Sequence, residues 1–238
     1  MLQSDFVILT DFARHGITPL YAPDFVPNSD HVPPLRDRYI KVKHTVNYLL
    51  YQQYLANTMI MLDTDLALTI PGLHLNPQHH ADSKEKPEGR VIGDLSGQHD
   101  LAYTPLNGIS SSKVALRQQI ADTWGEIKHP TIIQLVLMIL TAADVHGWPN
   151  IIIWKKDLKG AFNLLNYNPA YCRLFAFPLS DNVTMIHLAG LFGWIGMPHA
   201  FQVRHPIPAG HLLPYHNRIV SMVCRRPNGR FTYYNLYK

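Results

Sequence analysis

The sequence predicts an α+β protein, because apolar residues follow helix-type patterns in some stretches and strand-type patterns in others. Helix-type stretches occur at residues 36–56, 110–124 and 131–144. Short runs rich in β-branched and aromatic residues predict strands at 90–96, 151–154, 173–178 and 184–189. Of the 238 residues 47% are hydrophobic, which is enough to bury a substantial core in one or two domains.

In the N-terminal half, a helix, a loop and a strand follow an irregular beginning. The first 35 residues are rich in proline, aromatic residues and turn signals, which predict irregular structure. Apolar residues at helix spacing then predict a helix over residues 36–56. Prolines and polar residues predict a loop over residues 67–86, before the strand RVIGDLS at residues 90–96.

In the C-terminal half, two helices precede the remaining strands. Serines before an apolar-periodic run predict the start of the helix at residues 110–124. The run TIIQLVLMILTAA, residues 131–143, has 13 residues, whereas a bilayer span needs roughly 20, so it predicts a buried helix. A turn at residues 147–150 leads into the apolar strand at 151–154. Residues 180–182 predict the turn of a β-hairpin.

Charge is distributed unevenly along the chain. The net charge is +4, with 11 basic and 14 acidic residues up to Lys128 and 10 basic and 3 acidic residues from His129 onward. A basic C-terminal half fits contact with a phosphate backbone, although many basic domains bind no polyanion. Charge alone therefore leaves nucleic-acid binding and a plain basic surface equally open.

Cysteine usage and the N-terminus indicate an intracellular protein. Cys172 and Cys224 lie far apart without metal-ligand spacing, so they favour neither a disulfide framework nor a zinc site. Residues 1–5 lack the basic and apolar regions of a signal peptide. We expect a cytoplasmic or nuclear location and no membrane association.

The segment IIIWKKDLKGAFNLL is the most informative one for chemistry. Its apolar strand leads to Asp157, and a turn with Gly160 follows. An aspartate in this place can hold Mg²⁺ while substrate phosphates supply other ligands, but two-metal phosphoryl transfer needs further carboxylates beside it. Taken alone, an aspartate after an apolar strand is more often a helix N-cap. The neighbouring motifs therefore decide the interpretation.

Three segments together resemble retroelement reverse transcriptases. DLKGAF resembles the first palm motif of that family through Asp157 and Phe162. The second palm motif, F-G-x-x-x-x-P-x-x-F-Q, is matched in LFGWIGMPHAFQ by Phe192, Gly193, Pro198, Phe201 and Gln202. The sequences of both motifs are similar to those of reverse-transcriptase-like proteins abundant in oomycetes.

The third segment, KPEGRVIGDLS, resembles the fingers motif in which a lysine and an arginine grip the incoming triphosphate. Arg90 and Asp94 keep the family spacing, and Lys84 or Lys86 stands in the place of the lysine. The turn PLNG at residues 105–108 then stands roughly where the family has its Leu-Asn turn. The resemblance covers about residues 84–202.

The resemblance implies a role for each matched residue. Asp157 would hold Mg²⁺, with the carbonyl of Leu158 as a second oxygen. Phe162 would lie beneath the sugar of the incoming nucleotide and favour deoxynucleotides. Arg90 and a lysine would neutralise the β- and γ-phosphates. Gly193 would let the backbone approach nucleotide and template closely.

The other matched residues complete this assignment. Phe192 would belong to the nucleotide-binding site, and the expected structural residues are Asp94, Pro198, Phe201 and Gln202. Without the family context, a core aromatic is an equally good interpretation of Phe162. For Arg90, the alternative is a solvated surface charge.

The implied fold is a partial right-hand polymerase. Residues 1–150 would form the N-terminal region and fingers, with a fingers hairpin at 163–189. The partial palm, at 151–162 and 190–238, would be a ferredoxin-like sheet that lacks its catalytic hairpin. The family's aromatic-x-Asp-Asp motif is not found, since no Asp or Glu follows Asp181. We therefore expect a truncated or frameshifted copy of the retroelement. It should be inactive, because a single carboxylate cannot hold two Mg²⁺ ions.

Two further features have plain interpretations. His74, His79 and His80 form a loop cluster that we expect to be solvated, with transition-metal binding as the alternative. Residues 203–238 show no family pattern. Near their end lie Arg225, Arg226, Tyr233, Tyr234 and Tyr237, which we expect to belong to a frayed tail, with a basic-aromatic nucleic-acid surface as the alternative.

The resemblance implies a retroelement reverse transcriptase by descent, which carries out template-directed DNA synthesis by two-metal nucleotidyl transfer. Its cofactor would be Mg²⁺, and its partners would be an RNA or DNA primer–template and deoxynucleotides. One alternative is a non-catalytic nucleic-acid-binding remnant. A second is a fragment that does not fold stably, because a palm sheet without its third-motif hairpin exposes an unpaired strand edge.

Overall fold

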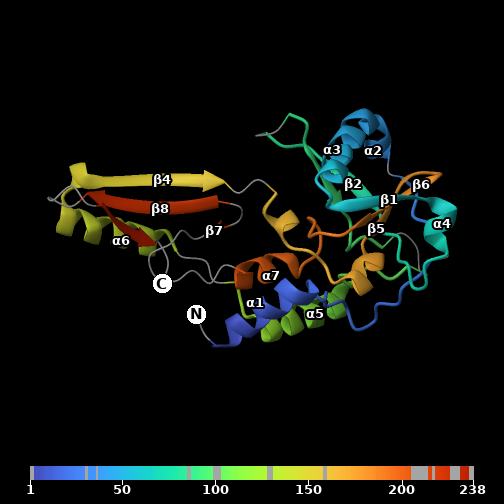
Figure 1. Cartoon of the computed structure of the whole chain (residues 1–238), viewed down its shortest axis with the longest axis horizontal. Helices are drawn as coiled ribbons and strands as arrows, with labels where there is room; N and C mark the ends of the chain where they lie inside the picture. The colour runs from blue at the N-terminus through green and yellow to red at the C-terminus, as the bar shows by residue number, and fades with distance from the viewer. Residues whose placement is uncertain are drawn as a thin grey trace.

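Two lobes make up the described part of the chain (Figure 1). The computed structural model describes residues 3–29, 32–35, 37–84, 87–98, 103–127, 131–157, 160–204, 214–215, 218–225 and 231–235. Within these ranges, side chains are described except at residues 3–6, 37–38, 152–157 and beyond 202. The predicted α+β class is confirmed, since the helices accompany small antiparallel sheets.

The larger lobe contains most of the helices and two of the sheets. Its elements are α1 (Gln3–His15), α2 (Asp37–Lys41), α3 (Lys43–Leu55), β1 (Met59–Asp63), α4 (Thr64–Leu68), β2 (Gln78–Ala81), β3 (Arg90–Gly93), α5 (Ser110–Trp124), the short 3₁₀-helices η2 (Ala161–Leu164) and η3 (Pro169–Leu174), β5 (Ala176–Ser180), β6 (Val183–His187) and α7 (Met197–Arg204).

The smaller lobe is one sheet with a helix on it. Its elements are α6 (Ile132–His146), the 3₁₀-helix η1 (Trp148–Asn150), β4 (Ile151–Asp157), β7 (Pro214–Tyr215), β8 (Arg218–Arg225) and β9 (Phe231–Asn235). Here β8 pairs with β4, β7 and β9, all antiparallel. The register places Arg218 opposite Asp157 at the end of β4.

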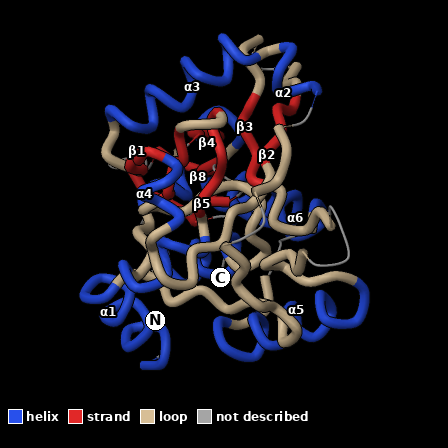
Figure 2. Tube along the Cα trace, turned by 90° about the vertical axis from the view of Figure 1, so that its right-hand side faces the viewer, coloured by secondary structure: helices blue, strands red, loops and turns tan. Residues whose placement is uncertain are grey.

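Antiparallel pairing joins distant parts of the larger lobe. One sheet has the order β1-β6-β5, so the β5–β6 hairpin adds to a strand from the N-terminal part of the chain. A second sheet is the β2–β3 pair, in which Ala81 faces Arg90. In Figures 1 and 2, α2 and α3 lie beyond these strands, and α1 and α5 lie at the opposite end of the lobe.

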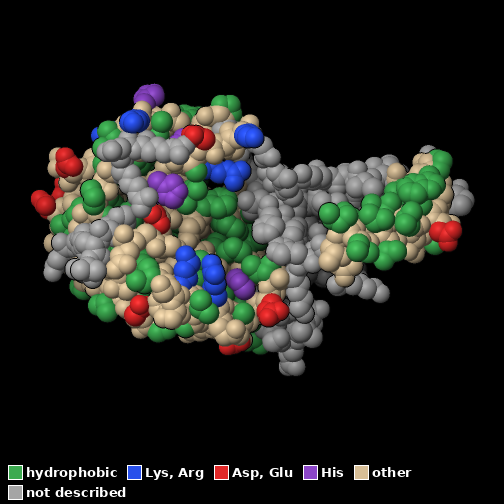
Figure 3. Space-filling model, turned by 180° about the vertical axis from the view of Figure 1, so that it is seen from behind, with side chains coloured by type: hydrophobic (Ala, Val, Ile, Leu, Met, Phe, Trp, Pro, Cys, Tyr) green, Lys and Arg blue, Asp and Glu red, His purple; other side chains and the backbone are tan. Residues whose placement is uncertain are grey.

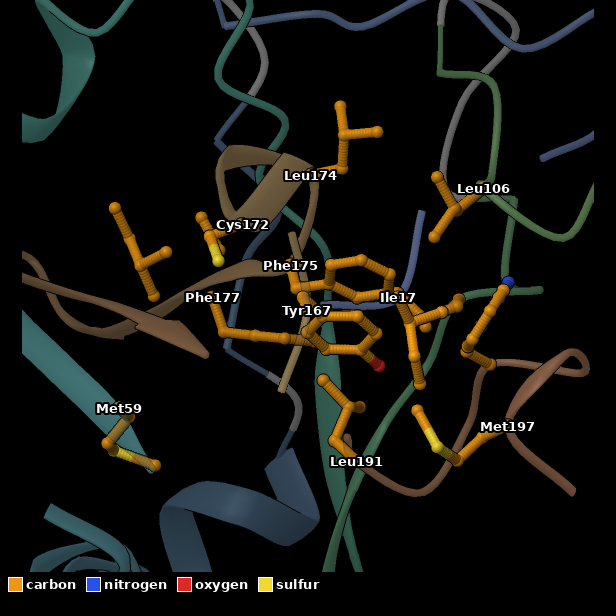
Figure 4. Packing of buried hydrophobic residues seen from close by; sticks show 14 of the residues in the cluster. Ile17, Met59, Leu106, Tyr167, Cys172, Leu174, Phe175, Phe177, Leu191 and Met197 are labelled. Carbon is orange, nitrogen blue, oxygen red and sulfur yellow. The ribbon is translucent and has the colours of Figure 1, made fainter. Parts of the chain in front are cut away.

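Stacked aromatic rings form the centre of the larger lobe's core (Figure 4). The rings of Tyr167 and Phe175 lie parallel with centroids 3.9 Å apart. Trp194 meets both rings edge-on, at 5.9 and 6.1 Å. Its indole N–H donates to the Leu20 carbonyl at 3.0 Å, so its polar atom is satisfied inside the core.

The strongest local signals gave correct elements. The helix predicted at residues 110–124 is α5, although its N-cap is Ile109 and the Ser112 hydroxyl accepts from the Ile109 N–H at 3.0 Å. The predicted hairpin around residues 180–182 is formed by β5 and β6. The predicted strand at residues 151–154 is β4, which continues to Asp157.

The expectation of irregular structure over the first 35 residues is wrong for its first part, where α1 forms. All prolines of this region come after residue 18, so the proline signal does not apply to α1. Ile8, Leu9 and Phe12 lie on one side of the helix and pack against the core. The Phe12 ring meets the Trp124 ring edge-on at 5.9 Å.

Two predictions in the N-terminal half need smaller corrections. The helix at residues 36–56 forms as two helices, α2 and α3, which are separated at Val42. The loop at residues 67–86 contains the strand β2, because the segment finds a partner in β3. The strand predicted over residues 90–96 ends at Gly93.

The expectation of a frayed tail over residues 225–237 is wrong for the part that the structure describes, because β9 forms there. Strands β8 and β9 pair with each other, and every residue of β4 pairs with a residue of β8. One edge of β4 is thereby paired. Sequence pattern missed this, because strand pairing depends on residues far apart in the chain.

The expectation that residues 131–143 form a buried helix is also wrong. The helix forms as α6, but Ile132 and Ile133 are 79% and 69% exposed, and Leu137 is 56% exposed. Its buried residues are Ala142 and Ala143. Figure 3 shows the hydrophobic side chains along this lobe. Among the described residues, no helix is long and apolar enough to cross a membrane.

His187 on β6 gives the fold a dependence on pH. Burial lowers the pKa of this imidazole from 6.5 to about 4, and its ring lies 5.3 Å from the Phe177 ring. Since the folded-state pKa is lower than the unfolded one, the unfolded state binds a proton first as the pH falls. Stability from this group is therefore present above pH 6.5 and is lost towards pH 4, by about 3 kcal/mol in total.

We expect His187→Gln to flatten this part of the pH profile. Urea unfolding between pH 7.5 and 4.5 should show a smaller loss of unfolding free energy in the variant than in the wild type. His15→Gln, at the exposed end of α1, is the control and should keep the wild-type slope. Parallel wild-type and His187→Gln profiles would contradict the assignment.

Candidate nucleotide-binding site

Side chains from all three motif segments contact one another in the larger lobe. The Arg90 guanidinium carbon lies 5.8 Å from the centre of the Phe192 ring. The Phe192 ring lies 4.9 Å from the Phe162 ring, which meets the Phe201 ring at 5.7 Å. A cation thus stands at one end of a row of rings, and only Phe201 among these residues is buried.

The elements that deliver these residues are short. Arg90 begins β3, and Phe162 lies in η2, which starts after Gly160 in the left-handed conformation (φ 61°). Phe192 precedes α7, whose residue Phe201 faces back towards η2. Residues from three separate regions of the sequence therefore form one cluster.

The backbones of two glycines touch beside this row. The Gly93 N–H donates to the Phe192 carbonyl at 3.2 Å, which joins the end of β3 to the second palm-like motif. A Cβ on Gly193 would lie 1.9 Å from the Gly93 carbonyl oxygen, and the φ of Gly193 is +122°. Both observations require glycine at residue 193. Gly193 itself is exposed, as a close backbone approach to a ligand requires.

Asn107 links the segments around Gly193. Its Nδ2 donates to the Gly193 carbonyl at 2.7 Å and to the Ser96 hydroxyl at 2.9 Å, and its Oδ1 accepts from the Ile195 N–H at 3.1 Å. The Lys113 ammonium donates to the same Ser96 hydroxyl at 3.0 Å. The PLNG turn, the end of the fingers-like segment and the second palm-like motif are therefore held together by one buried amide.

The residues predicted to be structural lie around this junction. Gln202 on α7 donates to the Glu126 carbonyl at 2.9 Å, just beyond α5. The Asp94 N–H donates to the Pro77 carbonyl at 2.8 Å, which ties β3 to the chain before β2. Pro198 is half-buried in the first turn of α7, where proline fits.

Arg90 has a hydrogen-bond donor that a ligand could use. Its Nε is buried and has no hydrogen-bond partner among the described residues. A buried guanidinium nitrogen without a partner costs free energy unless an acceptor is supplied. On the face of the larger lobe seen in Figure 3, Lys and Arg side chains gather on two sides of a hydrophobic hollow. A phosphate would provide the missing acceptor atoms.

The other predicted site residues are either exposed or lie, wholly or with their side chains, outside the described part of the chain. Lys84 is exposed in the connection between β2 and β3, and Lys86 lies outside the described residues. Leu158 also lies outside them. Asp157 ends β4, as predicted, and its side chain is outside the described part of the chain.

Carboxylates for a pair of Mg²⁺ ions are not brought together among the residues that the structure describes. Strand β8, which lies beside β4, has the sequence RIVSMVCR and contributes no carboxylate. Within the described residues, no group of three or more His, Cys, Asp or Glu could hold a metal ion. Two-metal transfer needs carboxylates shared between both ions.

The expectation of a solvated histidine cluster is wrong for two of its members. His74 is fully buried, and its Nε2 and the Tyr103 hydroxyl are hydrogen-bonded at 3.2 Å. His80 is buried as well, with its Nε2 at 2.8 Å from the Glu88 carbonyl oxygen. These rings belong to the packing of the lobe, since polar interior groups are normally hydrogen-bonded.

Three residues of the site were missed at the level of sequence: Ser96, Asn107 and Lys113. The PLNG turn did mark Asn107 as part of a family-like segment, but its side chain was given no role.

A scan against protein-family models finds no match for the chain, and a search of curated proteins finds no relative.

Proposed function

We propose that this chain is a reverse-transcriptase-like part of a retroelement that binds a primer–template and a deoxynucleoside triphosphate. The observation that carries the proposal is the contact between Arg90, Phe192 and Phe162, which come from three separate motif segments. A guanidinium beside partly exposed rings and a bare glycine backbone suits a phosphate, a base and a sugar together. Two-metal DNA synthesis would need carboxylates beyond Asp157.

A second candidate is a nucleic-acid-binding protein that has no nucleotide pocket. The absence of Asp and Glu from residues 182–238 favours it, because a basic surface alone binds phosphate backbones. The two candidates differ in one respect: only the first binds a deoxynucleoside triphosphate at Arg90.

We expect Arg90→Gln to weaken binding of a labelled primer–template and deoxynucleoside triphosphate about tenfold or more, since one charged hydrogen-bonding group is removed. Fluorescence anisotropy at several salt concentrations measures the effect, and the wild-type affinity should fall as salt rises. Arg14→Gln, at the exposed end of α1, removes the same charge elsewhere and should bind as the wild type does.

Equal losses in both arginine variants would favour the second candidate, because they would show binding by overall charge. No salt-dependent binding by the wild type would contradict both candidates.

A primer-extension assay with Mg²⁺ or Mn²⁺ is expected to give no product. Efficient synthesis that Asp157→Ala abolishes would contradict the conclusion that the carboxylates are too few.

A further inference from the structure

The position of the Gly193 backbone depends on contacts with other parts of the chain, the Gly93 backbone and the Asn107 side chain among them. Gly193 is exposed and adopts φ +122°, a conformation that its own segment has no regular secondary structure to maintain. It lies between Phe192, which contacts Arg90 and Phe162, and Trp194, which is anchored in the core. Anything that holds this backbone also holds one wall of the proposed nucleotide site.

Asn107 is the side chain that holds it. It is fully buried, and its amide group contacts Gly193 on one side and Ile195 on the other. Its backbone N–H donates to the Leu95 carbonyl at 2.8 Å, so the side chain projects from a fixed point beside β3. An amide is suited to this place, because it donates to one backbone carbonyl and accepts from the N–H two residues later.

We propose that Asn107 is a positioning residue of the nucleotide-binding site, which sets where the Gly193 backbone lies relative to Arg90 and Phe162. This inference rests on the proposed function for the ligand, but its geometric part stands on the hydrogen bonds themselves. Asn107 touches no ligand in this scheme. Its effect on binding would pass through Gly193 and Phe192.

Two measurements on one set of variants test the inference. Native-state amide exchange at Ile195 reports the hydrogen bond to Asn107 Oδ1, and anisotropy reports primer–template and nucleotide binding. In Asn107→Ala, the Ile195 amide should exchange at least about tenfold faster and the Kd should rise about tenfold, as for the loss of one buried hydrogen bond.

Asn76→Ala is the matched control. Asn76 is also fully buried, and its Nδ2 lies within hydrogen-bonding distance of three backbone carbonyls, those of His74, Leu174 and Ala176. We expect a comparable loss of global stability, with Ile195 exchange and Kd as in the wild type once the unfolded fraction is subtracted. If Asn107→Ala does not fold, Asn107→Asp, which keeps the acceptor and loses both donors, is measured in the same way.

The outcomes separate the inference from the proposed function. Unchanged protection of Ile195 in a folded Asn107 variant would overturn the inference. Equal weakening of binding by the Asn107 and Asn76 variants would overturn it too, because a merely structural role predicts that result. If the wild type binds neither ligand, the proposed function fails, and Ile195 exchange alone decides whether Asn107 positions the segment.

Discussion

Trp194→Ala is expected to lower the free energy of unfolding by about 4 kcal/mol, as for the loss of a large ring from a packed core. Trp194 is 1% exposed, and its ring meets those of Trp124, Tyr167 and Phe175. The substitution opens a cavity between these rings and removes the donor from the Leu20 carbonyl. Urea unfolding followed by circular dichroism measures the change.

Trp148→Ala is the control for this prediction. Trp148 is 61% exposed, so removing its ring should change the unfolding free energy by less than about 1 kcal/mol. Trp194→Phe should fall between the two, since it keeps much of the aromatic volume but loses part of the ring system and the N–H donor. Similar effects for residues 148 and 194 would mean that the aromatic core is not arranged as described.

Gly193→Ala is expected to cost about 3 kcal/mol of stability and to abolish nucleotide binding at the proposed site. The new Cβ would lie 1.9 Å from the Gly93 carbonyl oxygen, so one of the two backbones must move. The positive φ adds strain of its own. Because Phe192 is the preceding residue, this movement also displaces the ring that contacts Arg90.

Gly125→Ala separates strain from collision. Gly125 has φ +83°, and a Cβ there would meet no heavy atom within 4 Å. Its substitution should therefore cost only about 1 kcal/mol, the penalty for the conformation, and leave binding unchanged. If both alanine variants lose equal stability, the close approach of Gly93 and Gly193 is not a feature of the folded protein in solution.

Elements with strong local signals could be predicted from sequence. The helix α5 has an apolar stripe, serines near its start and Gly125 after its last residue, and its bounds were predicted correctly. The β5–β6 hairpin has a polar turn between two apolar runs. In both cases neighbouring residues contain the information that determines the element.

Features that depend on distant partners could not be predicted. The partner of β4 is a strand from a segment without a recognisable pattern. The apolar run of α6 predicted burial, but burial requires a partner surface, and the sequence of a helix says nothing about one. His74 likewise was expected to be solvated, and only the folded chain brings Tyr103 to it.

The candidate site divides along the same line. Motif spacing identified Arg90, Phe162, Phe192 and Gly193, and the fold brings these four together. The role of Asn107 depends on two hydrogen bonds to residues more than 80 positions away. A pattern within one segment contains no information about such a link. The expected metal site had Asp157 as its single carboxylate, and strand β8 beside β4 contributes no acid.

We propose that the fingers-like segment, Phe162 and the second palm-like motif form one surface that binds a primer–template and a nucleotide. Photo-cross-linking tests it most directly, with 5-iododeoxyuridine at the template base opposite the incoming nucleotide and mass spectrometry of the linked peptides. Cross-links should fall within residues 90–96, at Phe162 and within residues 192–202. Cross-links confined to residues 218–235, with none in these segments, would contradict the proposed binding surface.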